Sequence, residues 1–205
     1  MRIISGIRRG MNILPPNGSE TRPITDRVKE SIFDVLYKYN LIEDRYVGDL
    51  FCGTGSFGLE MLSRGAKEAV FVDADRRAIE VLRKNIEKAK FTEQSKVVCG
   101  SAFRIGAPIG VGRKCSLVFV DPPYVMSRDA GGKSQLAGLL KLLPEQITDD
   151  GLVVVRTEKE VNLLDSYGSL RIIDKRVWSK MTVAFFAINK DDKQTGCNTN
   201  NSESA

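Results

Sequence analysis

The 205-residue sequence contains no histidine, and its four cysteines form no CxxC pair. Histidine is the most common metal ligand and the usual general base, so we expect neither a zinc site nor Ser-His-Asp chemistry. Every apolar run is shorter than the ~18 residues that a membrane span requires, and the amino terminus has no secretory hydrophobic segment. With so few cysteines, we expect a cytoplasmic protein in a reducing compartment, without metal and without membrane contact.

An excess of basic residues is what the composition does have. The chain carries 31 Lys and Arg against 26 Asp and Glu, a formal charge of +5. Such an excess favours a polyanionic partner such as a nucleic acid. The apolar and charged fractions, 42% and 28%, are ordinary for a globular protein, and the length suits one domain with a substantial core.

The tetrapeptide Asp121-Pro122-Pro123-Tyr124 follows the apolar run 117–120, which predicts a short buried strand. Two prolines end that strand because proline has no backbone donor, and ligands bind at this end of open α/β sheets. Asp121 and the Pro122 carbonyl can accept the two protons of an exocyclic amine, and Tyr124 can stack on a flat base. The stretch therefore predicts a site that holds a base amine. The alternative is a plain strand-ending turn.

A glycine-rich loop, Gly53-x-Gly55-x-x-Gly58, follows the strand expected at 46–51 and precedes a helix, as in nucleotide-binding folds. Asp49 lies inside that strand, where it suits an amino group better than a pyrophosphate. Asp73 ends the next strand, about where a carboxylate binds ribose hydroxyls, whereas Asp75 has the position of a helix cap. These features together favour S-adenosylmethionine over NAD as the ligand.

Strand and helix patterns alternate from residue 45 onward. We expect strands at 46–51, 69–72, 96–99, 117–120, 152–155, 169–174 and 181–188, and helices at 59–64, 76–90 and 136–143. The last two strands have no helix between them and must form a hairpin. The pattern predicts a Rossmann-like α/β fold with a seven-stranded, mostly parallel sheet and a C-terminal antiparallel hairpin.

The first 44 residues differ from the rest. Residues 1–24 mix apolar, basic and glycine positions and predict a basic arm or hairpin, and Thr25 is expected to cap a helix. Arg27 and Lys29 near the start of that helix are candidates for phosphate contacts, the alternative for the arm being a solvated basic edge. We expect this arm and helix at 1–44, a catalytic domain at 45–189 and a polar, disordered tail at 190–205.

Three stretches, Arg22 to Glu30, Asp49 to Ala66 and Val118 to Tyr124, resemble the bacterial 16S rRNA guanine-N2 methyltransferase family. The resemblance runs from the arm to about residue 189. It implies a methyltransferase fold, S-adenosyl-L-methionine as donor, and one guanine of 16S rRNA as acceptor, within an assembling or assembled 30S subunit. We expect a monomer.

The candidate residues fall into three sets. They are Asp121, Pro122, Pro123 and Tyr124 for the base; Asp49, Phe51, Gly53, Thr54, Gly55, Asp73, Ala74, Ser101 and Ala102 for the donor; and Arg8, Arg9, Arg22, Thr25 and Arg27 for RNA.

Two positions depart from the pattern of the family. Ser101 stands where many methyltransferases have an acid, and Asp73 stands where the family more often has glutamate. Methyl transfer to an amine needs no covalent intermediate, so Cys52, Cys99 and Cys115 are expected to pack rather than react. The alternatives are an N6-adenine DNA or RNA methyltransferase with the same tetrapeptide, a non-catalytic RNA-binding assembly factor with a vestigial fold, and an NAD dehydrogenase.

Overall fold

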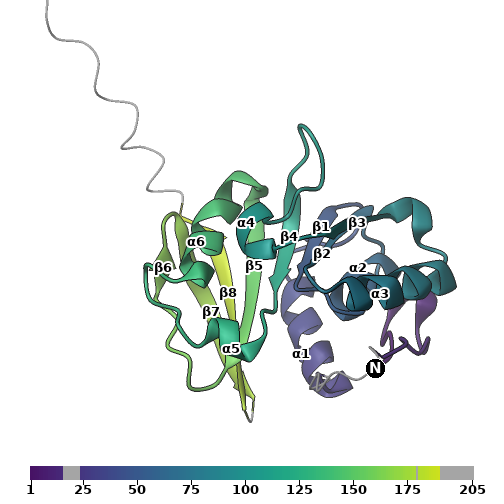
Figure 1. Ribbon diagram of the computed structural model, residues 1–205, viewed down its shortest axis with the longest axis horizontal. Helices are drawn as coiled ribbons and strands as arrows, with labels where there is room; N and C mark the ends of the chain where they lie inside the picture. The colour runs from purple at the N-terminus through teal and green to yellow at the C-terminus, as the bar shows by residue number, and fades with distance from the viewer. Residues whose placement is uncertain (16–23, 179, 190–205) are drawn as a thin grey trace, which may run out of the picture.

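The computed structural model describes residues 1–15, 24–178 and 180–189. In these ranges a sheet of order β3-β2-β1-β4-β5-β8-β7-β6 runs through the molecule, with helices on both faces (Figure 1). Its strands are β1 (Tyr46–Leu50), β2 (Glu68–Asp73), β3 (Ser95–Cys99), β4 (Cys115–Val120), β5 (Ile147–Glu158), β6 (Ser166–Tyr167), β7 (Leu170–Trp178) and β8 (Met181–Ile188). Strands β1 to β5 pair in parallel, and β6, β7 and β8 are antiparallel.

The helices divide between the two faces of the sheet. They are α1 (Asp26–Tyr37), α2 (Ser56–Ser63), α3 (Arg76–Ala89), α4 (Ala102–Ile105), α5 (Tyr124–Ser127) and α6 (Gln135–Leu142), with 3-10 turns η1 (Gly6–Arg8), η2 (Thr92–Gln94) and η3 (Leu143–Glu145). Alternate side chains of one strand point to opposite faces, so Phe119 packs in the core under α1, α2 and α3, while Val118 and Val120 pack in the core under α4 and α6. No helix of the described segments is long and apolar enough to cross a bilayer.

The order of the strands reverses between β1 and β4. From β1 the chain proceeds outward through β2 and β3, and it then returns to place β4 on the other side of β1. The connections after β1 and β4 therefore leave the carboxyl ends of their strands in opposite directions. This switch point is where open α/β sheets bind ligands.

The predicted sheet is confirmed, with one addition. All seven expected strands are present and the last pair is antiparallel, but β6 adds an eighth strand of two residues beside β7. A two-residue strand leaves no periodicity in the sequence, and β6 is fixed instead by the Tyr167 hydroxyl, which donates to the Ala130 carbonyl at 2.7 Å. Helix α2 begins at Ser56 rather than near residue 59, because Gly55 already serves as its N-cap.

The amino-terminal arm turns back on itself, as the glycines predict. Arg2 pairs with Asn12 in an antiparallel bridge, and the chain turns between Gly6 and Gly10, both of which have positive φ. The Gly6 position leaves no room for a side chain, because an added Cβ would lie 1.8 Å from the Ser63 carbonyl oxygen on α2. The arm is therefore packed tightly onto α2.

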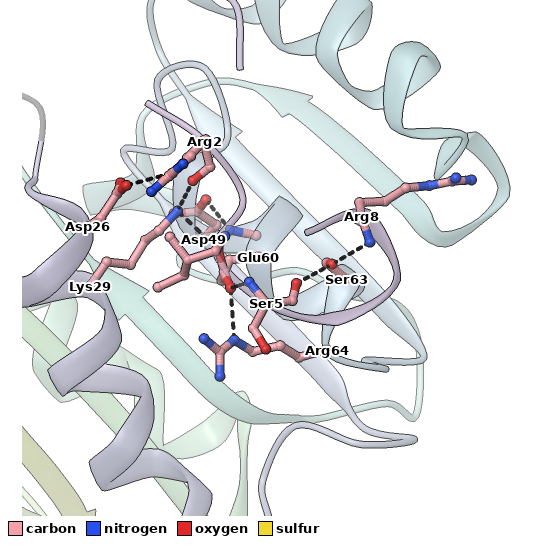
Figure 2. A network of polar contacts seen from close by, with 11 residues as sticks. Arg2, Ser5, Arg8, Asp26, Lys29, Asp49, Glu60, Ser63 and Arg64 are labelled. Carbon is pink, nitrogen blue, oxygen red and sulfur yellow. Dashed lines mark hydrogen bonds and ion pairs between the residues drawn. The ribbon is translucent and has the colours of Figure 1, made fainter. Parts of the chain in front are cut away.

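A buried carboxylate fastens the arm to this helix, as Figure 2 shows. Glu60 accepts hydrogen bonds from the backbone N–H groups of Ile4 and Ser5, at 2.8 and 3.0 Å. It also pairs with Lys29 of α1 at 3.0 Å and with Arg64 at 2.9 Å. The prediction that Lys29 faces phosphate is wrong: its ammonium is buried under the arm, where it also donates to the Arg2 carbonyl.

Candidate active site

The loop between β1 and α2 has the backbone shape that its glycines predict. Phe51, Gly53 and Gly55 all have positive φ, at 57°, 52° and 89°. A Cβ added at Gly55 would lie 2.5 Å from Leu82 Cδ1 of α3 and would force that side chain to shift, and the positive φ favours glycine as well. A Cβ added at Gly53 would meet nothing within 4 Å. The loop thus presents bare backbone to open space at Gly53, which fits the close approach of a ligand.

Two carboxylates hold the loop and the start of α2 in place. Asp49 Oδ2 accepts a hydrogen bond from the Gly58 amide at 2.7 Å, and Asp73 Oδ2 accepts one from the Gly53 amide at 2.8 Å. Burial is the main cause that raises the pKa of Asp49 to about 8; the Gly58 amide opposes this shift, and the nearby carboxylates of Asp121 and Asp73 support it. Asp49 is only 1% exposed, so it shapes the loop from within, and its contact with the amino group of a donor stays a prediction.

Asp73 remains half-exposed at the end of β2. Its second oxygen accepts from the Asp75 amide at 2.9 Å, while Asp75 itself caps α3 by accepting from the Arg77 amide, as predicted. The Asp73 backbone carbonyl accepts from Gly100 at 2.8 Å, which brings the loop after β3 beside the glycine loop. Asp73 thus lies between the two loops that a nucleoside would contact.

Among the other predicted donor residues, Ser101 is the half-exposed N-cap of α4 and makes no side-chain capping bond. Ala102 is buried and Ala74 is exposed, whereas Thr54 is buried and its carbonyl accepts from Asn85 at 3.1 Å. Sequence reasoning missed Phe103, whose ring lies 4.8 Å from that of Phe51. The pair joins the glycine loop to α4. The sequence signal for this pair was that Phe51 and Phe103 each lie at or shortly after the end of an expected strand.

The tetrapeptide lies on the adjacent strand at the same edge of the sheet. Its position is fixed by the Asp121 amide, which donates to the Leu50 carbonyl at 3.3 Å, so the loops after β1 and β4 start side by side. Pro122 is buried, and Pro123 caps α5 by accepting from Met126 and Ser127. No donor in residues 1–15, 24–178 and 180–189 is bonded to the Pro122 carbonyl. Tyr124, half-buried, begins α5.

An arginine that the sequence analysis did not single out completes this edge. Arg156 of β5 donates from Nε to Asp121 Oδ1 at 2.6 Å, and the two side chains are 15% and 18% exposed. Burial lowers the pKa of Arg156, but the charge and hydrogen bond of Asp121 outweigh this effect and the net pKa is raised. The signal was available: Asp121 and Arg156 each follow an apolar run of four residues, at 117–120 and 152–155.

The predicted RNA-contacting residues lie on and beside the arm. Arg9 and Arg27 are exposed, whereas Arg8 is half-buried and donates from Nε to the Ala89 carbonyl at the end of α3. Thr25 caps α1 by accepting from the Val28 amide at 3.4 Å, as predicted. Arg22 and the predicted tail at 190–205 lie outside the described residues.

A single side chain connects the arm to the glycine loop. Asn85 of α3 is fully buried and exchanges hydrogen bonds with the backbone of Leu14, at 2.8 and 3.2 Å. The same amide group donates to the Thr54 carbonyl. The end of the arm therefore lies one side chain away from the candidate donor site.

The cysteines near the site differ in burial. Cys52 and Cys115 are buried, and burial raises the pKa of both thiols, that of Cys115 to about 12, which keeps them protonated and unreactive. The prediction that Cys99 is a packing residue is wrong, because it is exposed at the end of β3. Strand β3 is at the edge of the sheet, where burial is incomplete.

Comparison with known proteins places this geometry in context. The model of the family described as conserved hypothetical protein 95 matches residues 1–187. The chain is 33% identical to YlbH of Bacillus subtilis, provisionally named an rRNA methyltransferase, over 91% of this chain and 98% of that protein. It is 34% identical to ribosomal RNA small subunit methyltransferase D of Escherichia coli K12, over 80% of this chain and 77% of that one.

Solved structures have the same architecture. The Escherichia coli protein yhhF, provisionally named a methyltransferase, superposes with a TM-score of 0.75 at 30% identity, covering 92% of this chain and 97% of that one. An RNA methyltransferase from Salinibacter ruber, solved in complex with S-adenosyl-L-homocysteine, superposes with a TM-score of 0.59 at 16% identity, covering 82% and 95%. The fold is thus that of Rossmann-like methyltransferases.

Proposed function

The chain belongs to the family described as conserved hypothetical protein 95, and from this premise we propose that it is an S-adenosyl-L-methionine-dependent rRNA methyltransferase. Its acceptor in this proposal is the exocyclic N2 amine of one guanine in 16S rRNA of the small ribosomal subunit. Two relatives with similarity over most of the chain carry names that refer to rRNA methylation. The choice of guanine as the acceptor base rests on the resemblance of the tetrapeptide and the arm to the guanine-N2 methyltransferase family.

The adjacency of two loops is the observation that carries the proposal. The amide of Asp121 is bonded to the carbonyl of Leu50, so the amine-holding loop and the glycine loop begin on neighbouring strands. A carboxylate oxygen of Asp121 and the carbonyl of Pro122, to which no donor of the described residues is bonded, supply two acceptors at this edge. Two acceptors are what an amine with two protons requires.

The loops after β1, β2 and β3, beside the tetrapeptide, have features that suit the methyl donor. Gly53 offers open backbone, Asp73 lies half-exposed between two loops, and Phe51 and Phe103 supply aromatic surface for a base. Bound there, S-adenosyl-L-methionine supplies an electrophilic methyl group. The protein's own part is to orient the acceptor: Asp121 and Pro122 bind the two amine protons, which turns the nitrogen lone pair away from them. Catalysis of this kind is mainly proximity and alignment.

Labelled-methyl transfer tests the proposal. Unmodified 16S rRNA, unmodified 30S particles and a DNA duplex are each incubated with the protein and labelled donor, and the methylated nucleoside is then identified. We expect N2-methylguanosine from the ribosomal acceptors. N6-methyladenosine would assign the tetrapeptide to adenine chemistry, and donor binding without transfer to any acceptor would support an assembly factor.

We also propose that the substrate is a folded particle rather than free RNA. The two exposed arginines predicted to contact RNA, Arg9 and Arg27, lie on a short arm and helix, and these can read few bases. Selection of one guanine then depends on the shape of a folded surface that presents it unstacked. Unmodified 30S particles should be methylated much faster than protein-free 16S rRNA. Equal or faster transfer to the free RNA would mean that the arm reads local sequence.

A further inference from the structure

We infer that Arg156 is a positioning residue for Asp121, so that the carboxyl end of β5 holds the Asp-Pro-Pro-Tyr loop in its working shape. The inference rests on the proposed function, because it names a further residue that acts in the same site. It adds a contribution from a second strand, β5, because the Arg156 side chain on this strand sets the orientation of the Asp121 carboxylate.

Strand register brings the two residues together. Val120 of β4 and Val155 of β5 are aligned partners; Asp121 directly follows the end of β4, and Arg156 is the next residue of β5. The prolines end β4 at this point, whereas β5 continues for three residues that pair only with β8, with Arg156 opposite Val183. Arg156 is thereby supported by the sheet on one side and faces the loop on the other.

The contact between Arg156 and Asp121 occupies one oxygen of the Asp121 carboxylate and leaves the other oxygen open to a ligand. Arg156 Nε is 2.6 Å from Asp121 Oδ1, a charge-assisted hydrogen bond between side chains that are mostly buried. No other side chain or amide in the described part of the chain is bonded to the Asp121 carboxylate. Oδ2 is thus available to accept an amine proton, while Oδ1 fixes the plane in which Oδ2 lies.

A second contact from β5 to this loop is much weaker. Glu158 is 3.8 Å from Arg128, the residue after α5, and the Arg128 side chain is 70% exposed. A long contact to a largely exposed arginine contributes little, because the arginine is solvated and free to move. The semi-buried bond of Arg156 is therefore the main polar hold of β5 on the tetrapeptide.

Direction matters here because the proposed chemistry depends on alignment. An unheld aspartate can rotate about its side-chain torsions, and a displacement of about 1 Å can lower a rate on the order of a hundredfold. Arginine suits the task because its planar guanidinium donates in fixed directions, which a lysine ammonium does not do. Arg156 in this role does not touch the methyl donor, so its loss should affect turnover and not donor binding.

Arg156→Gln and Arg156→Lys, each compared with the wild type on unmodified 30S particles, test the inference. For Arg156→Gln we expect kcat to fall on the order of tenfold to a hundredfold, with the donor Kd by calorimetry unchanged within about twofold. Arg156→Lys keeps the charge and should recover part of kcat. The matched control is Arg176→Gln, which removes a guanidinium 3.1 Å from Asp174 on β7 and should leave kcat unchanged.

A double-mutant cycle separates positioning from a general structural role. If Arg156 acts through Asp121, Arg156→Gln should have almost no further effect on kcat in an Asp121→Asn background. Equal losses of kcat in both backgrounds, or a weaker donor Kd that matches the loss of turnover, would overturn the inference. So would an Arg156→Gln variant as active as the wild type. A wild type that transfers no methyl to any acceptor would instead overturn the proposed function, and this inference with it.

Discussion

Lys29 Nζ lies 3.0 Å from Glu60 Oε2 in the interior of the protein, and the two side chains are 2% and 0% exposed. Removing both charges from water is unfavourable, and the pair is sustained because Glu60 also accepts from two amides of the arm and from Arg64. The arm, α1 and α2 are thus joined at the Glu60 carboxylate. Glu60 lies on α2, the helix that begins directly after the glycine loop.

Glu60→Gln should therefore destabilise the fold by about 3–5 kcal/mol, because it leaves the Lys29 ammonium buried without its charge partner. The free energy of unfolding in urea measures this change. Asp174→Asn is the matched control, since Asp174 pairs with Arg176 at the surface, where the loss should stay below about 1 kcal/mol. Equal effects of the two substitutions would show that the buried pair contributes no more than a solvated one.

Asp73→Ala should weaken the binding of S-adenosyl-L-methionine by about 1–3 kcal/mol, because it removes an acceptor for the ribose hydroxyls and the acceptor of the Gly53 amide. Titration calorimetry gives the Kd. Asp75→Ala serves as the control: it removes the cap of α3 and lowers stability by about 0.5–2 kcal/mol, but donor affinity should not change. If Asp75→Ala weakens the donor and Asp73→Ala does not, the ribose contact belongs to Asp75.

Replacing Arg9 and Arg27 by alanine should weaken RNA binding and flatten its dependence on salt. Each lost phosphate contact should reduce the slope of log K against log salt concentration by about 0.7–0.9. Lys67 and Lys114, two exposed lysines beside the amino ends of β2 and β4, supply a control that removes the same charge. An unchanged slope in the arginine variant would assign the arm to an ordinary solvated edge.

The pKa of Asp49, raised by burial to about 8, predicts how stability depends on pH. Between about pH 4 and 8 the folded protein keeps the Asp49 proton that the unfolded chain loses, so this group makes stability fall as pH rises, by at most about 1.4 kcal/mol per pH unit. The carboxylates of Asp121 and Asp73 also raise the pKa of Asp49, and the Lys29 ammonium lowers it. Urea unfolding across this range should therefore show a steeper decline for the wild type than for Asp49→Asn, and parallel curves would contradict a neutral, buried Asp49.

Much of the fold was predictable from the sequence, because most strands carry an apolar run and the glycines of the arm and of the 53–55 loop mark turns. The position of Asp121 at a strand end followed from the apolar run 117–120 and the two prolines after it. The partner of that carboxylate was harder to predict: Asp121 and Arg156 each follow an apolar run of four residues, but only the register of β4 with β5 brings them together, and no local pattern encodes that register. Lys29 was misplaced for a similar reason: a helical wheel cannot predict that the arm covers the polar side of α1.

Identification of the methylated nucleoside tests the central claim most directly. Wild-type protein and Asp121→Ala are incubated with labelled donor and unmodified 30S particles, and the 16S rRNA is digested to nucleosides and separated. The account predicts N2-methylguanosine from the wild type and none from Asp121→Ala, although the variant should remain folded and bind the donor. Turnover by Asp121→Ala within a few-fold of the wild type, or a labelled nucleoside other than N2-methylguanosine, would contradict it.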